Sequence, residues 1–147
     1  MKKVFIITII LIIFSIASIK SKSEYNYLLK ENSYNLYKIK IKNLNTKNIN
    51  NYIDKVNIKK IYPKINPIYK EKIGNIAYQI NSSNMKLEID EFKRKYLNII
   101  KKNNYSDYNY LYANGIDIEA IEVYMNSKDL YYFLNSNDAN VVDKKGH

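Results

Sequence analysis

The stretch IEAIEVYMNSKDLYYFLNSNDANVVD (residues 118–143) changes its apolar period halfway along. Its first part alternates apolar and polar side chains up to Met125, which is typical of a half-buried strand. From Ser127, a helix-capping residue, the apolar positions 130, 133 and 134 follow the spacing of one helix face. A polar turn and the pair Val141-Val142 come next. The stretch therefore predicts a strand, a helix and a short closing strand.

A second unit of the same kind is predicted at residues 35–65. In YKIKIK (37–42), lysines alternate with apolar side chains, so one face of a strand is basic and the other is buried. We expect a solvated lysine face here, and a polyanion-binding face is the alternative. Asn45 and Thr46 then supply caps for a short helix, and VNIKKIYPKI predicts a strand that Pro63 interrupts or ends.

Between the two units, turns are predicted at Pro63–Pro67 and Gly74-Asn75, followed by a third strand at residues 76–80. The segment MKLEIDEFKRKYLNIIKKNN predicts the longest helix, which begins either at Met85 or only at Asp90. Its apolar residues form one stripe, namely Ile89, Phe92, Tyr96, Ile99 and Ile100. Asn114-Gly115 predicts a hairpin turn that pairs residues 110–112 with 116–118. The expected fold is a small single α+β domain at 34–143. It has two strand–helix–strand units around one long helix, and a mixed sheet with helices on one face.

KIKIKNLNTKNINNYIDKVNIKKIYPKI resembles the first half of the sigma-factor-regulator C-terminal domain of Gram-positive bacteria. IDEFKRKYLNIIKKNN and IEAIEVYMNSKDLYYFLNSNDANVVD resemble its second half, so the resemblance covers roughly residues 34–143. The glycine usual between the late strand and helix is replaced by Asn126, and only three residues precede the apolar segment, where such regulators carry a sigma-binding domain. The resemblance implies an extracytoplasmic sensing or interaction module without anti-sigma activity of its own.

The first 20 residues carry the features of an export signal. Lys2 and Lys3 precede an apolar run at 4–14, and Ser15-Ile16-Ala17 has the small-x-small pattern that precedes cleavage. A cut between Ala17 and Ser18 would give a secreted protein. Without it, residues 4–19 would anchor the chain in the cytoplasmic membrane. Either outcome places the body outside the cytoplasm. A polar spacer is expected at 21–33 and a disordered tail at 144–147.

The net charge of +10 comes from 24 basic and 14 acidic residues, and Arg94 is the only arginine. Lys, Asn, Ile and Tyr all have A/T-rich codons, so base composition explains much of the charge. Nucleic-acid binding is not expected, because sequence readers rely on arginine forks. The chain has no cysteine, which excludes thiolate chemistry and cysteine metal sites.

Few residues offer catalytic chemistry. The only histidine is the terminal His147, so no Ser-His pair or zinc cluster is expected, and no cofactor or metal is predicted. Asp117 and Glu119 would share a face of a regular strand, as two-carboxylate sugar hydrolysis requires, although an exposed acidic edge explains them as well.

The predicted binding residues are Tyr105, Tyr108, Tyr110 and Tyr112, because exposed tyrosines stack on sugars or contact proteins. Burial of one strand face is the alternative for them. We therefore expect an exported or membrane-tethered, non-catalytic interaction or sensing module of the cell envelope, whose partner is an unknown protein or envelope component. Its binding face would be the tyrosine-rich segment 105–112 or an uncovered face of the sheet. The alternative is a small exported enzyme or inhibitor that acts on envelope polymers through Asp117 and Glu119.

Overall fold

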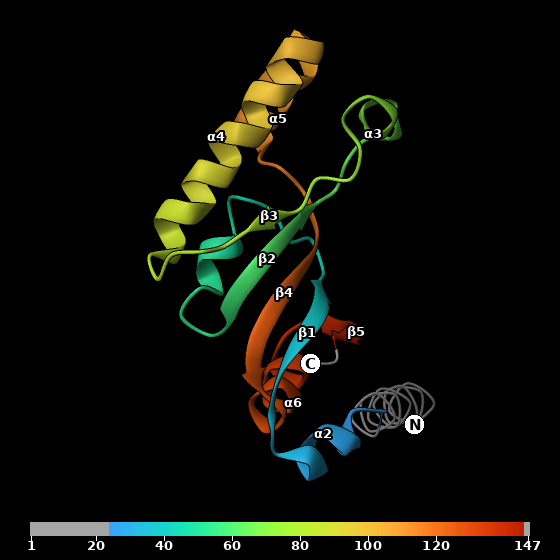
Figure 1. The fold of residues 1–147 in the computed structure, drawn as a ribbon, viewed down its shortest axis with the longest axis vertical. Helices are drawn as coiled ribbons and strands as arrows, with labels where there is room; N and C mark the ends of the chain where they lie inside the picture. The colour runs from blue at the N-terminus through green and yellow to red at the C-terminus, as the bar shows by residue number, and fades with distance from the viewer. Residues whose placement is uncertain (1–23, 146–147) are drawn as a thin grey trace, which may run out of the picture.

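The computed structural model describes residues 24–145, which form one α+β domain (Figure 1). The predicted leader with its Ala17–Ser18 cleavage site lies outside the described residues, as do residues 146–147. The elements are α2 (Asn26–Glu31), β1 (Tyr34–Ile41), the 3-10 turn η1 (Ile49–Asn51), β2 (Asn57–Pro63), α3 (Pro67–Ile73), β3 (Tyr78–Gln79), α4 (Met85–Asn103), α5 (Tyr105–Asn114), β4 (Ile118–Asn126), α6 (Ser127–Ser136) and β5 (Ala139–Lys145).

The sheet has five strands in the order β3-β2-β4-β1-β5. Each neighbouring pair is antiparallel, so the prediction of a mixed sheet is wrong. The second strand–helix–strand unit exists, whereas the first has only the 3-10 turn η1 between its strands. Each unit is split by a strand of the other. β4 lies between β1 and β2, and β1 lies between β4 and β5. The two strands of a unit therefore run in the same direction without touching. The ladder contacts join strands of different units, apart from the pairing of β2 with β3.

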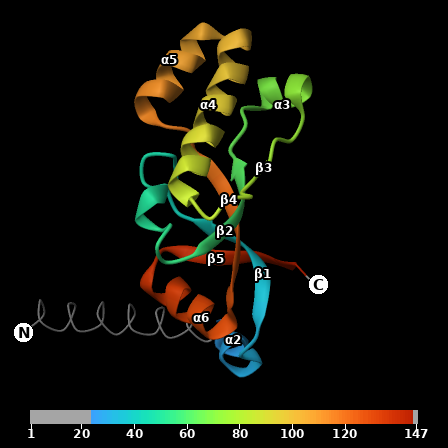
Figure 2. The same cartoon turned by 60° about the vertical axis from the view of Figure 1, so that its left-hand side comes forward.

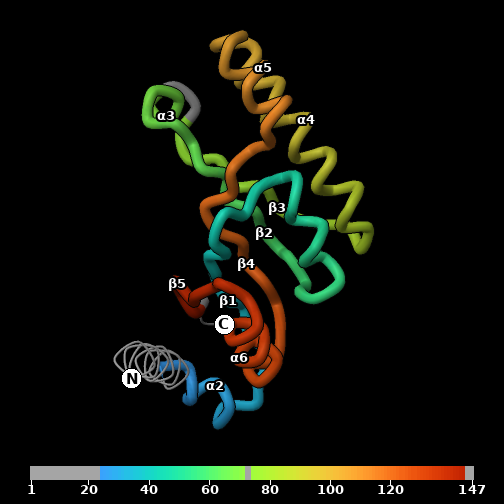
Figure 3. The backbone as a smooth tube through the Cα atoms, turned by 180° about the vertical axis from the view of Figure 1, so that it is seen from behind, coloured from blue at the N-terminus to red at the C-terminus, as the bar shows by residue number. Residues whose placement is uncertain are grey.

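One face of the sheet is covered by helices, as predicted. Figures 2 and 3 show α4 and α6 on the same side of the sheet, and apolar side chains from both helices join a single core with the strands. Apolar and lysine side chains alternate along β1, and successive side chains of a strand point to opposite faces. Tyr37 and Ile39 are therefore fully buried, whereas Lys38 and Lys40 point to the opposite face. The lysine face predicted from YKIKIK is therefore real, and no helix packs over it among the described elements (Figure 1).

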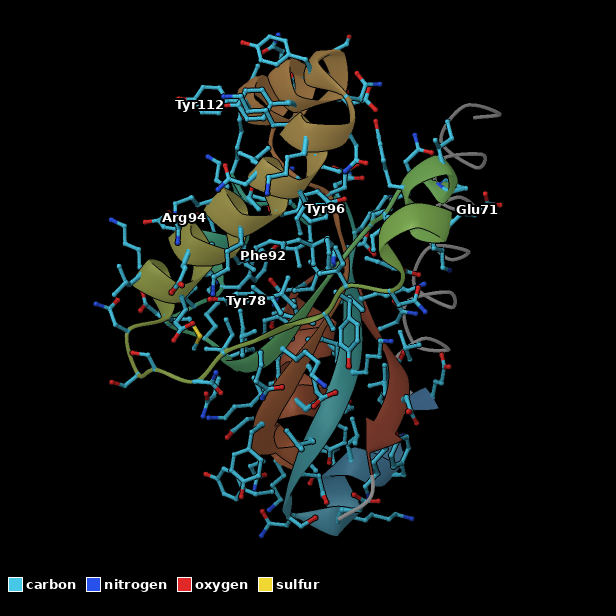
Figure 4. The ribbon with its side chains drawn as sticks, turned by 45° about the horizontal axis from the view of Figure 1, so that its top comes forward. Glu71, Tyr78, Phe92, Arg94, Tyr96 and Tyr112 are labelled. Carbon is cyan, nitrogen blue, oxygen red and sulfur yellow. The ribbon has the colours of Figure 1, made fainter. Side chains whose placement is uncertain are left out.

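The longest helix, α4, begins at Met85 and not at Asp90. The side chain of Asn84 accepts a hydrogen bond from Leu87 N at 3.2 Å, which satisfies one of the free amide groups of the first turn. Figure 4 shows Phe92 and Tyr96 turned from α4 toward the sheet, with Arg94 on the opposite side of the helix. The amphipathic stripe read from the sequence is thus the one that packs.

Three local predictions are wrong or incomplete. The helix expected after Asn45 is only the 3-10 turn η1 within a series of turns. The third strand is confirmed but has two residues, Tyr78 and Gln79. The turn predicted at Pro63–Pro67 corresponds to the loop at 64–66, but the sequence did not predict α3, whose first residue is Pro67 and whose cap is Asn66.

Both ends of the folded body extend further than predicted. Residues 26–31 were assigned to a polar spacer, but they form α2, which packs on α6 and buries Leu28 completely. Lys144 was assigned to a disordered tail, but it lies in β5 and its Nζ is 2.9 Å from Oε2 of Glu31. Within residues 24–145, none of the helices combines the length and the apolar composition needed to cross a membrane.

Candidate functional site

The segment YSDYNYLY forms helix α5, so the predicted hairpin between residues 110–112 and 116–118 is wrong. Asn104 explains the helix, because its side-chain oxygen accepts hydrogen bonds from Ser106 N at 2.9 Å and Asp107 N at 3.3 Å. This cap starts a second helix directly after α4 ends. An asparagine followed three residues later by an aspartate was a visible helix-start signal that the hairpin prediction overlooked.

Tyr105, Tyr108 and Tyr112 form a continuous row on one face of α5, which we call the tyrosine ladder. Their spacing of three and four residues brings neighbouring rings together. The ring centres of Tyr105 and Tyr108 are 5.7 Å apart, and those of Tyr108 and Tyr112 are 5.9 Å apart. The Nζ of Lys101, at the end of α4, lies 5.1 Å from the centre of the Tyr108 ring. The ladder is therefore an ordered aromatic surface with a cation at one side.

The ladder is exposed. Tyr105 is 61% exposed and Tyr112 is 63% exposed, and none of the ten residues of α5 is fully buried. Tyr108 and Leu111 are partly buried and hold the helix against the rest of the protein. Figure 4 shows Tyr112 on the outer side of the arm formed by α4 and α5. The alternative prediction, that one tyrosine face is buried in a sheet, does not describe this segment.

Tyr110 lies apart from the ladder. It lines a cavity of about 280 Å³ between α3, α4 and α5, together with Tyr69, Tyr96 and Asp107. The phenol of Tyr69 donates a hydrogen bond to Oδ2 of Asp107, and this bond raises the pKa of Tyr69 above its ordinary value. The contact ties α5 to α3. Tyr110 borders the joint between these helices, although 66% of it is exposed.

The two carboxylates of the alternative function do not line the same cavity. Asp117 lines a cavity with Asn45 and Lys64, whereas Glu119 lines another cavity on the uncovered face of the sheet. Oε1 of Glu119 is 3.9 Å from Nζ of Lys40, and both side chains are about half exposed. An exposed ion pair of this kind is typical of a solvated surface. Glu119 does not lie at a sheet edge, because β4 is the central strand of the sheet.

The uncovered face of the sheet carries a network that the sequence did not single out. The phenol of Tyr62 donates a 3.1 Å hydrogen bond to Oε2 of Glu122, although only 7% of Glu122 is exposed. The ammonium group of Lys38 lies 4.0 Å from the centre of the Tyr62 ring. Burial and the hydrogen bond to Glu122 together raise the pKa of Tyr62 to about 12.

Among the residues that the structure describes, no group of three or more potential metal ligands lies close enough together to hold an ion. Comparison of the chain with protein-family models, characterised proteins and solved structures gave no significant match. Two surfaces therefore remain as candidates, the tyrosine ladder of α5 and the uncovered sheet face around Tyr62.

Proposed function

We propose that this protein is an exported or membrane-tethered, non-catalytic interaction module of the cell envelope, and that it binds a protein partner through the tyrosine ladder. The export signal in the first 20 residues supports the location. The resemblance to the extracytoplasmic domain of sigma-factor regulators supports a sensing role. The single observation that carries the binding role is a row of three tyrosines in tilted ring contact on one helix face, whose two outer members, Tyr105 and Tyr112, are exposed.

The spacing of the ladder favours a particular way of binding. Tyr105, Tyr108 and Tyr112 stand at positions i, i+3 and i+7, the anchor positions of a helix that lies in a groove of its partner. Tyrosines are favoured at such contacts because the ring supplies apolar area at a low cost in side-chain entropy, while the hydroxyl remains hydrogen-bonded. The partner is expected to offer an apolar groove with an acidic rim that faces Lys101 and Lys102.

The position of the arm agrees with this role. α2, which directly follows the leader segment in the chain, lies at the opposite end of the molecule from the tip of α4 and α5 (Figure 1). α4 alone is 19 residues long, which corresponds to about 28 Å of helix. A chain tethered through its first residues would therefore present the ladder on the side away from its tether.

Site-specific photocrosslinking tests the proposal. A photoreactive phenylalanine analogue replaces Tyr105 or Tyr112 in cells that make the full chain, and Tyr132 on α6 is the matched control because it is 62% exposed. We expect the same partner protein, identified by mass spectrometry, in adducts from positions 105 and 112 and not from 132. Equal capture from all three positions, or no adduct from the ladder, would refute the ladder as the binding surface.

Cell fractionation tests the location separately. The full chain with a C-terminal tag is followed in the medium, in membranes and in the cytosol, and the first residue of the mature product is determined. A species in the medium that begins near Ser18 indicates cleavage, and a full-length species in membranes indicates an anchor. A folded, full-length species in the cytosol would refute the envelope location.

A further inference from the structure

A cavity of about 300 Å³ opens beside Tyr62 on the uncovered sheet face. Its lining is largely polar and includes Lys38 from β1, Lys70 from α3 and Asn75. Apolar residues form a smaller part of the lining, namely Pro63, Ile65, Ile76 and Ala77. The cavity thus combines two lysines with a small aliphatic area, as a site for a small amphipathic molecule would require.

The acidic groups nearby do not cancel this positive charge. Glu119 also lines the cavity, but Lys40 lies beside its carboxylate. Glu122 is hydrogen-bonded by Tyr62, and the sheet register pairs it with a lysine on each neighbouring strand, Lys38 on β1 and Lys60 on β2. The register of β1 with β5 adds a third carboxylate, because it pairs Lys38 with Asp143. Four lysines and three carboxylates therefore share this region, which keeps a small positive excess.

Glu122 gives the cavity a fixed geometry. A carboxylate that is only 7% exposed is unusual on a sheet face that no helix covers, because burial of a charge is costly unless the group is hydrogen-bonded. Its hydrogen bond with the Tyr62 hydroxyl holds the phenol ring in place, and the ammonium group of Lys38 makes a cation–π contact with that ring. The charge of Lys38 is therefore positioned before any ligand arrives, which lowers the entropy cost of binding.

We propose that this cavity binds the carboxylate group of a small ligand that also carries a short aliphatic chain. Lysine is a compact point charge that attracts anionic oxygen atoms, so Lys38 and Lys70 would receive the carboxylate. The chain would cover Ile65 and Ile76, which a fully oxygenated anion such as phosphate would leave in contact with water. This site lies on the sheet and α3, so it does not depend on the tyrosine ladder.

The test is a titration of the purified protein with acetate, butanoate, hexanoate and inorganic phosphate at constant ionic strength, followed by calorimetry. Affinity is expected to rise about threefold to fourfold for each added methylene group, which is the effect of burying it. Lys38→Met should weaken hexanoate binding about fivefold or more. Lys42→Met is the matched control, because it removes the same charge just after β1 and outside the cavity, and it should leave the affinity unchanged.

Tyr62→Phe tests whether binding depends on the position of the Lys38 ammonium group as well as on its charge. It keeps the ring beneath Lys38 but removes the hydrogen bond to Glu122, so it should weaken hexanoate binding while circular dichroism shows an unchanged fold. Three results would overturn the proposal. They are the absence of hexanoate binding, phosphate binding as tight as that of hexanoate, and an equal loss from Lys38→Met and Lys42→Met.

Discussion

Replacement of Thr46 by valine should loosen the junction between the helical arm and the sheet. Thr46 makes two hydrogen bonds with Ile116, the residue that follows α5 and Gly115. Its backbone N–H donates to Ile116 O at 3.0 Å, and its Oγ1 accepts from Ile116 N at 3.0 Å. Both residues are buried, so water cannot replace the second bond when the hydroxyl is lost.

The magnitude follows from this geometry. Thr46→Val has nearly the same shape, so it leaves no cavity, but it leaves the N–H of Ile116 without an acceptor in a site that is 1% exposed. An unpaired buried donor costs about 1–3 kcal/mol of the free energy of unfolding. Thr46→Ser keeps the hydroxyl and removes one methyl group, which costs about 0.8 kcal/mol. The valine variant should therefore be the less stable of the two.

Urea unfolding followed by circular dichroism measures both variants. With a slope of about 2 kcal/mol per M, the valine variant should lower the midpoint by about 0.5–1.5 M with an unchanged slope. A midpoint for Thr46→Val equal to that of the wild type, together with a lower one for Thr46→Ser, would show that the methyl group and not the hydrogen bond holds the junction.

Three further outcomes follow from the structure. An ultraviolet titration of phenolate should show, in the difference between the wild type and Tyr62→Phe, one tyrosine that ionises near pH 12. Because folding raises the pKa of Tyr62, its contribution to the free energy of unfolding is present below pH 10 and is lost as the pH rises toward 12. Leu28→Ala should lower the free energy of unfolding in urea by about 2–5 kcal/mol, because Leu28 is fully buried. The same substitution in an exposed spacer would leave this free energy unchanged. Gly115→Ala should lower the free energy of unfolding more than Gly74→Ala does. Both glycines have positive φ, but only a Cβ at Gly115 would meet other atoms, Lys47 Cγ at 3.2 Å and Thr46 Oγ1 at 3.3 Å. Equal losses in the two variants would contradict this.

Patterns with a clear period predicted the fold class correctly. The alternation through Ile39 and Val123 selected the buried faces of β1 and β4, and the stripe through Phe92 and Ile100 selected the packed side of α4. These signals are reliable because burial of one face is decided by the local period of apolar residues. The same information placed the lysines of β1 on a solvated face.

The order of the strands could not be read in this way. Each unit is split by a strand from the other, and the pairing of β1 with β4 joins residues 80 or more positions apart. The local pattern of a strand is the same whichever neighbour it has. The network of Tyr62 and Glu122 was missed for this reason, because the two residues meet only through the pairing of β2 with β4.

Helices with weak apolar patterns were the other source of error. α3 and α5 each begin after an asparagine cap, Asn66 and Asn104, but neither has a strong stripe of buried residues. The hairpin prediction relied on Asn114-Gly115, a common turn pair. In the structure, Gly115 ends α5 with a φ of +90°, so the same glycine serves as a helix terminator.

The number of tyrosines alone does not explain the ladder. A genome rich in A and T supplies lysine, asparagine and isoleucine as readily as tyrosine, and lysine is the better helix former at an exposed position. A helix that only bridged α4 and β4 would therefore be expected to carry lysine or asparagine on its outer face. Instead, Tyr105 and Tyr112 are exposed, and each has a ring contact with Tyr108. Exposed rings at this spacing contribute little to the core, which is why we propose that they contact a partner.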